Sequence, residues 1–351
     1  MEFKIQNKFV GYNHTLFFIA EAGVNHNGST EMGRQLIDIA VKAGADAVKF
    51  QTFKTENIII PNAPKSTYHV ETTGDDSNQS WFELLKTQEM SREMHVRLIE
   101  YCFDKKIIFL STPYDEESAD MLEDLDVSAF KIASTDTSNI PLLRYIACKG
   151  RPMILSTAMA TMKEVEEAVT AVRGEGLEDI ALMQCTGNYP AKLSDSNLRV
   201  MQTYMEKLNC IVGYSDHTMD FINPVAATVM GAKIYEKHFT IDKSLPGPDH
   251  RMSLNPEELI KTVKAIRDTE MALGSSKKQV LKSEKENRIR LRKSIVANTD
   301  INKDQTIQEK MIAIKRPGSG ISPGSIDNVI GKKAVIDIPL GTLISFDMLD
   351  G

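Results

Sequence analysis

Cysteine is scarce in this sequence, and the few cysteines are widely spaced. The 351 residues contain four of them, and no two form a CxxC pair. Structural zinc sites and disulfide frameworks both need closely spaced or numerous cysteines. The sequence therefore indicates neither kind of cross-linked scaffold. The four cysteines are Cys102, Cys148, Cys185 and Cys210.

Long apolar runs and excess positive charge are also lacking. No run approaches the ~18 apolar residues that a transmembrane helix needs, and the first fifteen residues lack the apolar centre of a secretory signal. The formal net charge of -6 does not favour nucleic acid or an anionic membrane as partner. With 42% hydrophobic and 26% charged residues, the chain has the composition of a globular protein. We expect a cytoplasmic enzyme.

Eight short apolar runs alternate with amphipathic stretches along most of the chain. Such runs, each followed by a helical pattern, predict a parallel sheet covered by helices. Eight units of this kind close into a (β/α)8 TIM barrel of roughly 250 residues. The runs lie at 16–23, 45–53, 107–113, 129–134, 152–158, 180–185, 210–216 and 233–239.

Two of the intervening helices have clear ends in the sequence. Ser29 is suited to cap a helix that ends before Gly44, with Met32, Leu36, Ala40 and Ala43 at helical spacing. Asn255 and Glu258 form a capping-box pattern around a proline at the first helical position. This second helix is predicted to run to Gly274 and to bury Leu259, Val263, Ile266 and Leu273.

The sequence divides into three parts. The barrel is predicted over residues 1–274, a hydrophilic linker over 275–292, and a compact β-rich domain over 293–351, where short β-like pieces alternate with turn residues. Residues 54–80 follow the second strand and are much longer than an ordinary βα loop. Such insertions are lids, binding elements or surface excursions, and the sequence leaves these alternatives open.

Two histidines stand at the ends of consecutive predicted strands. His217 and His238 would lie at the carboxyl end of the barrel, where such folds place their chemistry. Because neighbouring strands are about 5 Å apart, the two side chains could share one divalent metal ion. Asp216, Glu236 and Asp249 are close to them in sequence. The alternative is that each histidine packs in the fold without binding anything.

Two lysines lie inside predicted apolar strands, where a charge is costly unless an anion pairs with it. Lys49 and Lys131, with hydroxyls at neighbouring strand ends, predict a site for a small phosphorylated and carboxylated molecule. One alternative is a salt bridge to a barrel carboxylate such as Glu21. Another is Schiff-base catalysis by a lysine, which the two histidines argue against because a metal ion would already activate a carbonyl. The other polar candidates are Gln51, Thr112, Ser134, Asp136, Ser156, Asn188, Tyr189 and Ser215.

The carboxylates at the barrel mouth are not equivalent. Glu21 ends the first predicted strand, beside the NHNG sequence, and is the best candidate for an acid/base or substrate-positioning group. Glu236 and Lys237 precede His238 on the same strand, and we interpret their side chains as pointing away from the site at the barrel mouth.

Ordered motifs along the whole chain resemble the sialic acid synthase family. They are AEAGVNHNG, VKFQT, FLSTP, FKIAS, ILSTAM, QCT followed by YP, GYSDHT, and EKHFT followed by PGPDH. KRPGSGI at 315–321 is similar to that family's C-terminal antifreeze-like (SAF) domain. The resemblance implies condensation of phosphoenolpyruvate (PEP) with an open-chain N-acylated mannosamine, giving a nine-carbon 2-keto sugar acid and phosphate.

The resemblance also implies roles for individual residues. His217 and His238 would hold Mn2+, or Mg2+ or Co2+, to polarise the sugar aldehyde, and Glu21 would move a proton or bind the sugar. Two protein ligands leave room for water and substrate, as in catalytic metal sites. The implied PEP ligands are Lys49, Thr112, Lys131, Ser134, Ser156 and Ser215. The implied contacts to the sugar or to metal-bound water are Gln51, Tyr189 and Asp249.

The small C-terminal domain acquires a role through the same resemblance. Arg316 of the KRPG motif would reach the active site of a partner subunit and contact the acyl group of the sugar. The implied assembly is a domain-swapped homodimer.

Some motifs depart from the family pattern. Asp136 stands where the family often has glutamate, and Gly187 stands where it has asparagine, with Asn188 one place later. The change at Gly187 lies at the sugar-binding end, whereas the PEP half keeps the family pattern. N-acetylneuraminate synthesis is the first choice, with N,N'-diacetyllegionaminate or pseudaminate synthesis as alternatives and a 6-phosphorylated sugar less favoured. A non-catalytic carbohydrate- or ice-binding protein is the alternative from another class, although charged groups at the barrel mouth argue against it.

Overall fold

The computed structural model describes residues 1–74 and 79–351. The chain divides after Gly274 into two compact units, Met1–Gly274 and Ser275–Gly351. We describe each unit by itself.

The first unit contains a parallel sheet with the strand order β5-β4-β3-β10-β9-β8-β7-β6 in the described part of the chain. The end strands β5 and β6 also lie in contact, so the sheet curls into a near-barrel. All eight predicted strands are present, which confirms the TIM-barrel prediction. Their bounds are β3 Phe17–Gly23, β4 Ala47–Thr52, β5 Ile108–Pro113, β6 Phe130–Ile132, β7 Met153–Ser156, β8 Ile180–Cys185, β9 Ile211–Asp216 and β10 Ile234–His238.

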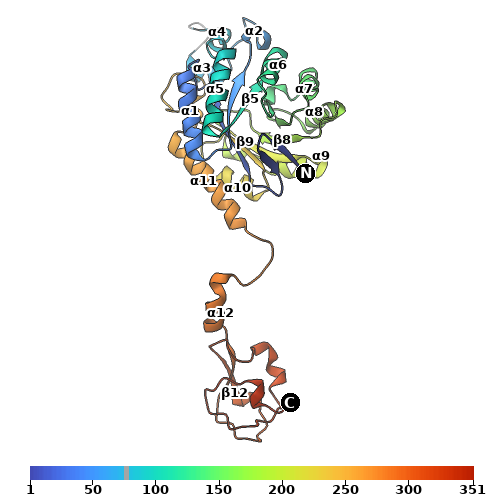
Figure 1. The fold of residues 1–351 in the computed structure, drawn as a ribbon, viewed down its shortest axis with the longest axis vertical. Helices are drawn as coiled ribbons and strands as arrows, with labels where there is room; N and C mark the ends of the chain where they lie inside the picture. The colour runs from blue at the N-terminus through green and yellow to red at the C-terminus, as the bar shows by residue number, and fades with distance from the viewer. Residues whose placement is uncertain (75–78) are drawn as a thin grey trace. The chain divides into compact units, whose positions relative to one another are not determined.

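Helices surround these strands (Figure 1). They are α1 Thr30–Ala43, α5 Arg92–Lys105, α6 Glu116–Asp124, α7 Ile140–Ala147, α8 Met162–Gly174, α9 Val200–Leu208, α10 Ile222–Val229 and α11 Pro256–Leu273. Single 3-10 turns lie at η1 Ser134–Asp136, η2 Leu193–Asp195 and η3 His250–Met252. Each helix buries an apolar face against the sheet, so the main hydrophobic core lies between the strands and the helix ring.

The predicted helix ends are confirmed, with one exception at the end of α11. Ser29 Oγ accepts from the Met32 N–H, and Gly44 follows α1 with a φ of 79°. Asn255 and Glu258 form the expected capping box. Leu273, however, is 52% exposed. The buried side chains of α11 stop at Ile266, so the last two turns or so of this helix extend past the packed face.

An N-terminal hairpin closes the end of the barrel at which its strands begin. Strands β1 Glu2–Ile5 and β2 Lys8–Gly11 pair antiparallel. Phe3 and Ile5 join a buried cluster with the first inward residues of the barrel strands, such as Phe17 and Ile234. The hairpin therefore plugs the end opposite the carboxyl termini of the strands.

The insertion after β4 carries short helices. They are α2 Thr55–Ile58, α3 Thr67–Thr73 and α4 Trp81–Lys86, the last with a Ser80–Glu83 capping box. The Tyr68 hydroxyl donates to the carbonyl oxygen of Pro248, beyond β10. This contact ties α3 to the loop that follows the last barrel strand. Residues 75–78 of this insertion lie outside the described residues.

The second unit begins with a short helix and continues as a small β-rich fold. Strands β11 Ser294–Ala297 and β12 Ile312–Lys315 pair antiparallel. A separate apolar cluster, with Ile295, Ile301 and Ile338 among its members, forms its core. Its helical elements are η4 Lys282–Glu284, α12 Lys285–Leu291, η5 Glu309–Met311, η6 Pro323–Asn328 and η7 Phe346–Met348. Across both units, none of the described helices is long and apolar enough to cross a membrane.

Candidate active site

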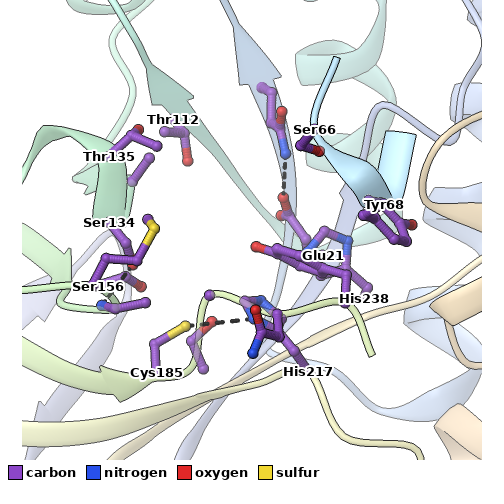
Figure 2. A pocket seen from close by; sticks show the side chains of 18 of the residues that line it. Glu21, Ser66, Tyr68, Thr112, Ser134, Thr135, Ser156, Cys185, His217 and His238 are labelled. Atoms are coloured by element: carbon purple, nitrogen blue, oxygen red, sulfur yellow. Dashed lines mark hydrogen bonds between the residues drawn. The ribbon is translucent and has the colours of Figure 1, made fainter. Parts of the chain in front are cut away.

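A cavity of about 630 Å³ opens at the carboxyl ends of the barrel strands. Its lining includes most of the predicted site residues: Glu21, Lys49, Gln51, Thr112, Lys131, Ser134, Ser156, Asn188, Tyr189, Ser215, His217 and His238. In the close-up the strand-end hydroxyls lie across the cavity from the glutamate and the histidines (Figure 2). We call this space the lysine chamber.

Strand register explains why these side chains meet. Glu21 is the direct partner of Lys49 on one side and of His238 on the other. Because side chains alternate between the two faces of a strand, Glu236 and His238 point the same way, into the barrel. Lys237 points to the opposite face, where its Nζ lies 3.1 Å from Asp216 Oδ2.

The interpretation that Glu236 points elsewhere is therefore wrong. Its carboxylate accepts from Ser215 Oγ at 3.0 Å, and its oxygens lie 3.8 Å from Lys49 Nζ and 3.5 Å from Lys131 Nζ. Lys49 Nζ also lies 2.9 Å from Glu21 Oε2, so the salt bridge considered for Lys49 exists. Two buried ammonium groups are thus balanced by two buried carboxylates.

Hydroxyl groups complete the surroundings of the two lysines. Lys49 Nζ donates to Thr112 Oγ1 at 2.9 Å, and Lys131 Nζ donates to Ser156 Oγ at 2.6 Å. Ser134 Oγ, near Lys131 in sequence, accepts from a backbone N–H at 2.9 Å. Ammonium groups flanked by hydroxyl donors form a site that suits phosphate and carboxylate groups.

Burial and charge shift the pKa values of this cluster in different directions. Burial, with repulsion from Glu236, raises the pKa of Glu21 to about 7 despite attraction by Lys49. Burial acts to lower the pKa of Lys49, but Glu21 and Glu236 outweigh it and the pKa is raised. Burial lowers the pKa of Lys131, and Glu236 only partly offsets this. Glu21 can therefore exchange a proton near neutral pH. Burial also raises the pKa of Asp249, to about 6, against attraction by His217 and Lys49.

The two histidines lie side by side at the rim of the lysine chamber. Their ring centroids are 5.6 Å apart, and the Tyr189 ring lies 4.1 Å from that of His217. His217 Nδ1 contacts the Thr186 carbonyl oxygen at 2.6 Å, which leaves Nε2 for a ligand. His238 Nδ1 is buried with no hydrogen-bond partner among the described residues, and Asp249 Oδ2 lies 3.8 Å from it.

This arrangement fits a metal held by few protein ligands. Among the described residues, no group of three or more His, Cys, Asp or Glu side chains is placed to hold an ion. A divalent ion would therefore depend on His217 and His238, with water and substrate completing its shell. Burial, then the neighbouring His217, lowers the pKa of His238 well below its usual range. His238 is thus neutral, the form that binds metals.

A bend in β3 brings three predicted sugar-binding groups together. The pairing of β3 with β4 shifts register between Glu21 and Gly23, and Gly23 has a φ of 53°. A Cβ at Gly23 would lie within 3.5 Å of Glu21 Oε1, Gln51 Nε2 and Asp249 Oδ2. Gln51 Nε2 donates to Glu21 Oε1 at 3.2 Å. The glycine therefore leaves the space in which these polar groups converge.

Three candidate residues, Asp136, Asp216 and Asp249, are not among the described residues that line the lysine chamber. Asp136 and Asp249 line an adjoining space instead. Asp216 is buried on the outer face of β9, where it accepts from Tyr235. Arg316 belongs to the second unit, where it is exposed and its Nε donates to the Leu291 carbonyl oxygen at 3.1 Å.

Several lining residues were not found from the sequence. Cys185 Sγ lies 3.6 Å from His217 Nδ1, and Tyr68, His69 and Trp81 line the cavity from the insertion. The alternation of β8 could have identified Cys185, because it shares the inward face with Met183. The insertion has no regular periodicity, so no sequence signal placed its aromatic residues at the mouth.

Comparison with known proteins places these features in a family. Residues 36–278 match the NeuB family, and residues 292–350 match the SAF domain. The chain is 41% identical to N,N'-diacetyllegionaminic acid synthase of Legionella pneumophila over 97% of its own length and 96% of the relative. It is 34% identical to human (Homo sapiens) N-acetylneuraminate-9-phosphate synthase, covering 98% and 95% of the two chains. The crystal structure of N-acetylneuraminic acid synthetase from Leptospira borgpetersenii, in complex with citrate, superposes with a TM-score of 0.71 at 34% identity, over 82% of this chain and 95% of that one.

Proposed function

The chain belongs to the NeuB family of PEP-dependent sialic acid-type synthases, and from that premise we propose that it condenses PEP with an N-acylated mannosamine-type sugar in its open-chain form. A carbon–carbon bond forms between PEP and the sugar aldehyde. Phosphate leaves from the PEP carbon that becomes the keto carbon of the product, and water supplies the oxygen found on that carbon afterwards. The product is a nine-carbon 2-keto sugar acid.

The observation that carries this proposal is the pairing of two different functions at one barrel mouth. Lys49 and Lys131 lie at the floor of the lysine chamber, where they can bind an anion, and His217 and His238 lie at its rim. A binding protein for an anion would not need the histidines, and a simple metal site would not need the buried lysines. An enzyme that joins an anionic phosphoester to a carbonyl compound needs both.

The anionic substrate fits the floor of the chamber. Lys49 and Lys131 would hold the phosphate and carboxylate groups of PEP, with the hydroxyls of Thr112, Ser156 and Ser215 as further donors. Glu236 already contacts both ammonium groups in the structure. It keeps them charged and in place before an anion arrives.

The acceptor sugar would lie above the anion, near Gln51, Tyr189 and Asp249. Glu21 stands between the two substrates and has a raised pKa near 7, so it can deliver or take up a proton at the sugar oxygen. His217 and His238 would hold a divalent ion, Mn2+ being our first choice and Mg2+ or Co2+ alternatives. Such an ion supplies Lewis-acid polarisation of an aldehyde oxygen.

Phosphate release from PEP tests the proposal. Metal-stripped protein would be assayed with Mn2+, Mg2+ or Co2+ added back and with N-acetylmannosamine or 2,4-diacetamido-2,4,6-trideoxymannose as acceptor. We expect release only when metal, PEP and an acceptor are all present, and loss of release in His238→Ala. Release without acceptor, or none with any acceptor, would refute the assignment. So would full metal-dependent activity in His238→Ala.

A further inference from the structure

The rings of His217 and His238 lie next to each other at the barrel mouth (Figure 2), but the sheet fixes only one of them directly. His238 is paired with Glu21 of β3. The register of β9 with β10 ends one residue earlier, where Lys237 lies opposite Asp216, and His217 follows the end of β9. Contacts other than the sheet register must therefore set the position of His217 relative to β10.

The Asp216 carboxylate closes a turn around His217. Its Oδ1 accepts from the backbone N–H and from the hydroxyl of Thr218, at 2.9 and 2.8 Å. Asn223 Nδ2, from α10, donates to the same oxygen at 3.4 Å and to Thr218 Oγ1 at 3.2 Å. An aspartate that binds the backbone N–H two residues further on fixes the course of the chain between them. The residue enclosed in this way is His217.

The side chains of Lys237 and Tyr235 join this turn to β10. Lys237 Nζ lies 3.1 Å from Asp216 Oδ2 and also donates to the carbonyl oxygen of Thr218. The Tyr235 hydroxyl donates to Asp216 Oδ2 at 2.6 Å. The residue before His217 and the residue after it are therefore both bound to one lysine of β10.

These contacts lie on the outer face of the strands, away from the lysine chamber. Asp216 is 1% and Lys237 is 2% exposed, and neither is among the described residues that line the chamber. Well-packed apolar residues of similar volume often stabilise a fold as well as a buried ion pair does, or better. Apolar side chains could not, however, supply directed bonds to both sides of one turn.

From these observations, and resting on the proposed function, we propose that Asp216 and Lys237 are positioning residues for the metal site. They hold the turn of His217 against β10, and so set the separation and relative orientation of its ring and that of His238. The contact of His217 Nδ1 with the Thr186 carbonyl oxygen fastens the ring to the loop after β8 instead. Because the proposed ion has only two protein ligands, displacement of one ring removes half of the protein's contribution to binding.

The affinity of the protein for Mn2+ alone tests this inference without turnover. We would measure the Kd from the EPR signal of free Mn2+, without PEP or sugar, at a temperature at which each variant is folded. Loss of a group that orients a metal ligand costs about 10–100-fold in metal affinity, so Asp216→Asn should raise the Kd by that factor. The KM for PEP at saturating Mn2+ should not change, because Lys49 and Lys131 keep their surroundings. A wild-type Kd in Asp216→Asn would overturn the inference.

Asp46→Asn is the matched control, at the opposite end of the barrel. Asp46 precedes β4 and is also a buried carboxylate. It accepts from the backbone N–H of Phe18 at 2.7 Å and from Arg267 Nη2 at 2.6 Å. Its substitution should lower Tm and leave the Kd for Mn2+ unchanged. Equal weakening of Mn2+ binding in both variants would attribute the effect to destabilisation alone and overturn the inference.

The double variant Asp216→Asn/Lys237→Met separates positioning from stability. It removes both charges together and leaves no buried charge unpaired, so its Tm should lie closer to that of the wild type than the Tm of Lys237→Met alone. Its Kd for Mn2+ should stay raised, because the links between the turn and β10 are still absent. This variant also provides the test if Asp216→Asn does not fold. Return of wild-type affinity in the double variant would assign the pair a purely structural role.

His238→Ala gives the proposed function its own readout in the same titration. It removes a ligand, so it should bind Mn2+ at least as weakly as Asp216→Asn. If the wild-type protein binds no Mn2+, or if His238→Ala binds it as tightly as the wild type, the proposed metal site is refuted and this inference with it. Weak binding by His238→Ala beside wild-type binding by Asp216→Asn would overturn this inference alone.

Discussion

Glu21 is a buried carboxyl group between a lysine and a second carboxylate. Lys49 attracts its charged form at 2.9 Å, but burial and Glu236 oppose that form and raise the pKa to about 7. The group is therefore protonated below about pH 7 and ionised above it. A wild-type profile of kcat/KM should show an ionisation near this pH, unlike that of an ordinary surface carboxyl group.

Glu21→Gln removes this ionisation and keeps the size of the side chain. Loss of a general acid or base costs on the order of 100-fold to 10,000-fold in rate, so we expect kcat/KM to fall at least 100-fold and the step near pH 7 to disappear. Glu31→Gln, at the exposed start of α1, serves as the control. A variant profile that keeps the step would assign the ionisation to another group.

Glu236 leads to a prediction about stability and ligand binding. Glu236→Gln leaves Lys49 and Lys131 without their shared carboxylate, and breaking a buried ion pair costs about 3–5 kcal/mol. We expect a clear fall in Tm that added PEP largely reverses, because its anionic groups take over the role of the carboxylate. The gain in Tm with PEP should exceed that of the wild-type protein.

Asp216→Asn is the matched control for that experiment. Asp216 is also a buried carboxylate paired with a lysine, Lys237, but on the outer face of the barrel strands. The substitution should lower Tm without enhancing the response to PEP. If PEP rescues both variants equally, Glu236 has no special relation to the anion site.

The same pair of carboxylates shows what can be predicted for single residues. The sequence identified Glu21, the lysines and the histidines because charged residues stood out in apolar strands. The alternation of β10 places Glu236 on the inner face as well, because residues two apart share a face and His238 points inward. The positions of Asp249 and Trp81 depend on the long connections after β10 and β4, whose course is set by tertiary contacts that no local pattern reveals.

At the scale of elements, the strands and helices with a regular apolar periodicity were predicted correctly. Eight strands and the caps of α1 and α11 follow from apolar runs and end signals that are local in sequence. The β1–β2 hairpin was missed because each strand has four residues, too few for a clear alternation. The exposed end of α11 was missed because the apolar pattern continues beyond the surface that the sheet offers for packing.

The loop between β3 and α1 makes the fold sensitive to acid. His26 in this loop is buried, and burial, with His95 and His250 nearby, lowers its pKa to about 4. The unfolded chain binds this proton near pH 6.5, so between about pH 6.5 and 4 the unfolded state takes up more protons than the folded state. Stability therefore falls as the pH is lowered through this window, by about 2–4 kcal/mol from this group.

His26→Gln should flatten that dependence. We expect a lower Tm at pH 7.5, because a packed ring is lost, but a smaller difference in Tm between pH 7.5 and pH 5 than in the wild-type protein. Thermal unfolding at a series of pH values measures both effects. An unchanged slope would mean that the acid sensitivity arises elsewhere, with His250 as the next candidate because burial also lowers its pKa to about 4.

At the scale of the whole molecule, the second unit carries Arg316, which the sequence resemblance assigns to a partner subunit's active site. It has its own core, and the Nε of its exposed Arg316 donates to the Leu291 carbonyl oxygen. We propose that this unit completes the active site of a partner subunit in a domain-swapped homodimer. Each active site would then combine the barrel of one chain with Arg316 of the other.

Mixing two inactive variants tests this arrangement directly. His238→Ala has a defective barrel and an intact Arg316, whereas Arg316→Ala has an intact barrel and lacks the arginine. Co-expressed chains that pair at random should recover about a quarter of wild-type sites if Arg316 acts across the dimer, because half of the dimers are mixed and each of these has one complete site. If Arg316 acts on its own barrel, no dimer has a complete site and mixing restores nothing. Mixtures of either variant with the double variant His238→Ala/Arg316→Ala are the control and should stay inactive in both cases, so only exchange between subunits can produce recovery.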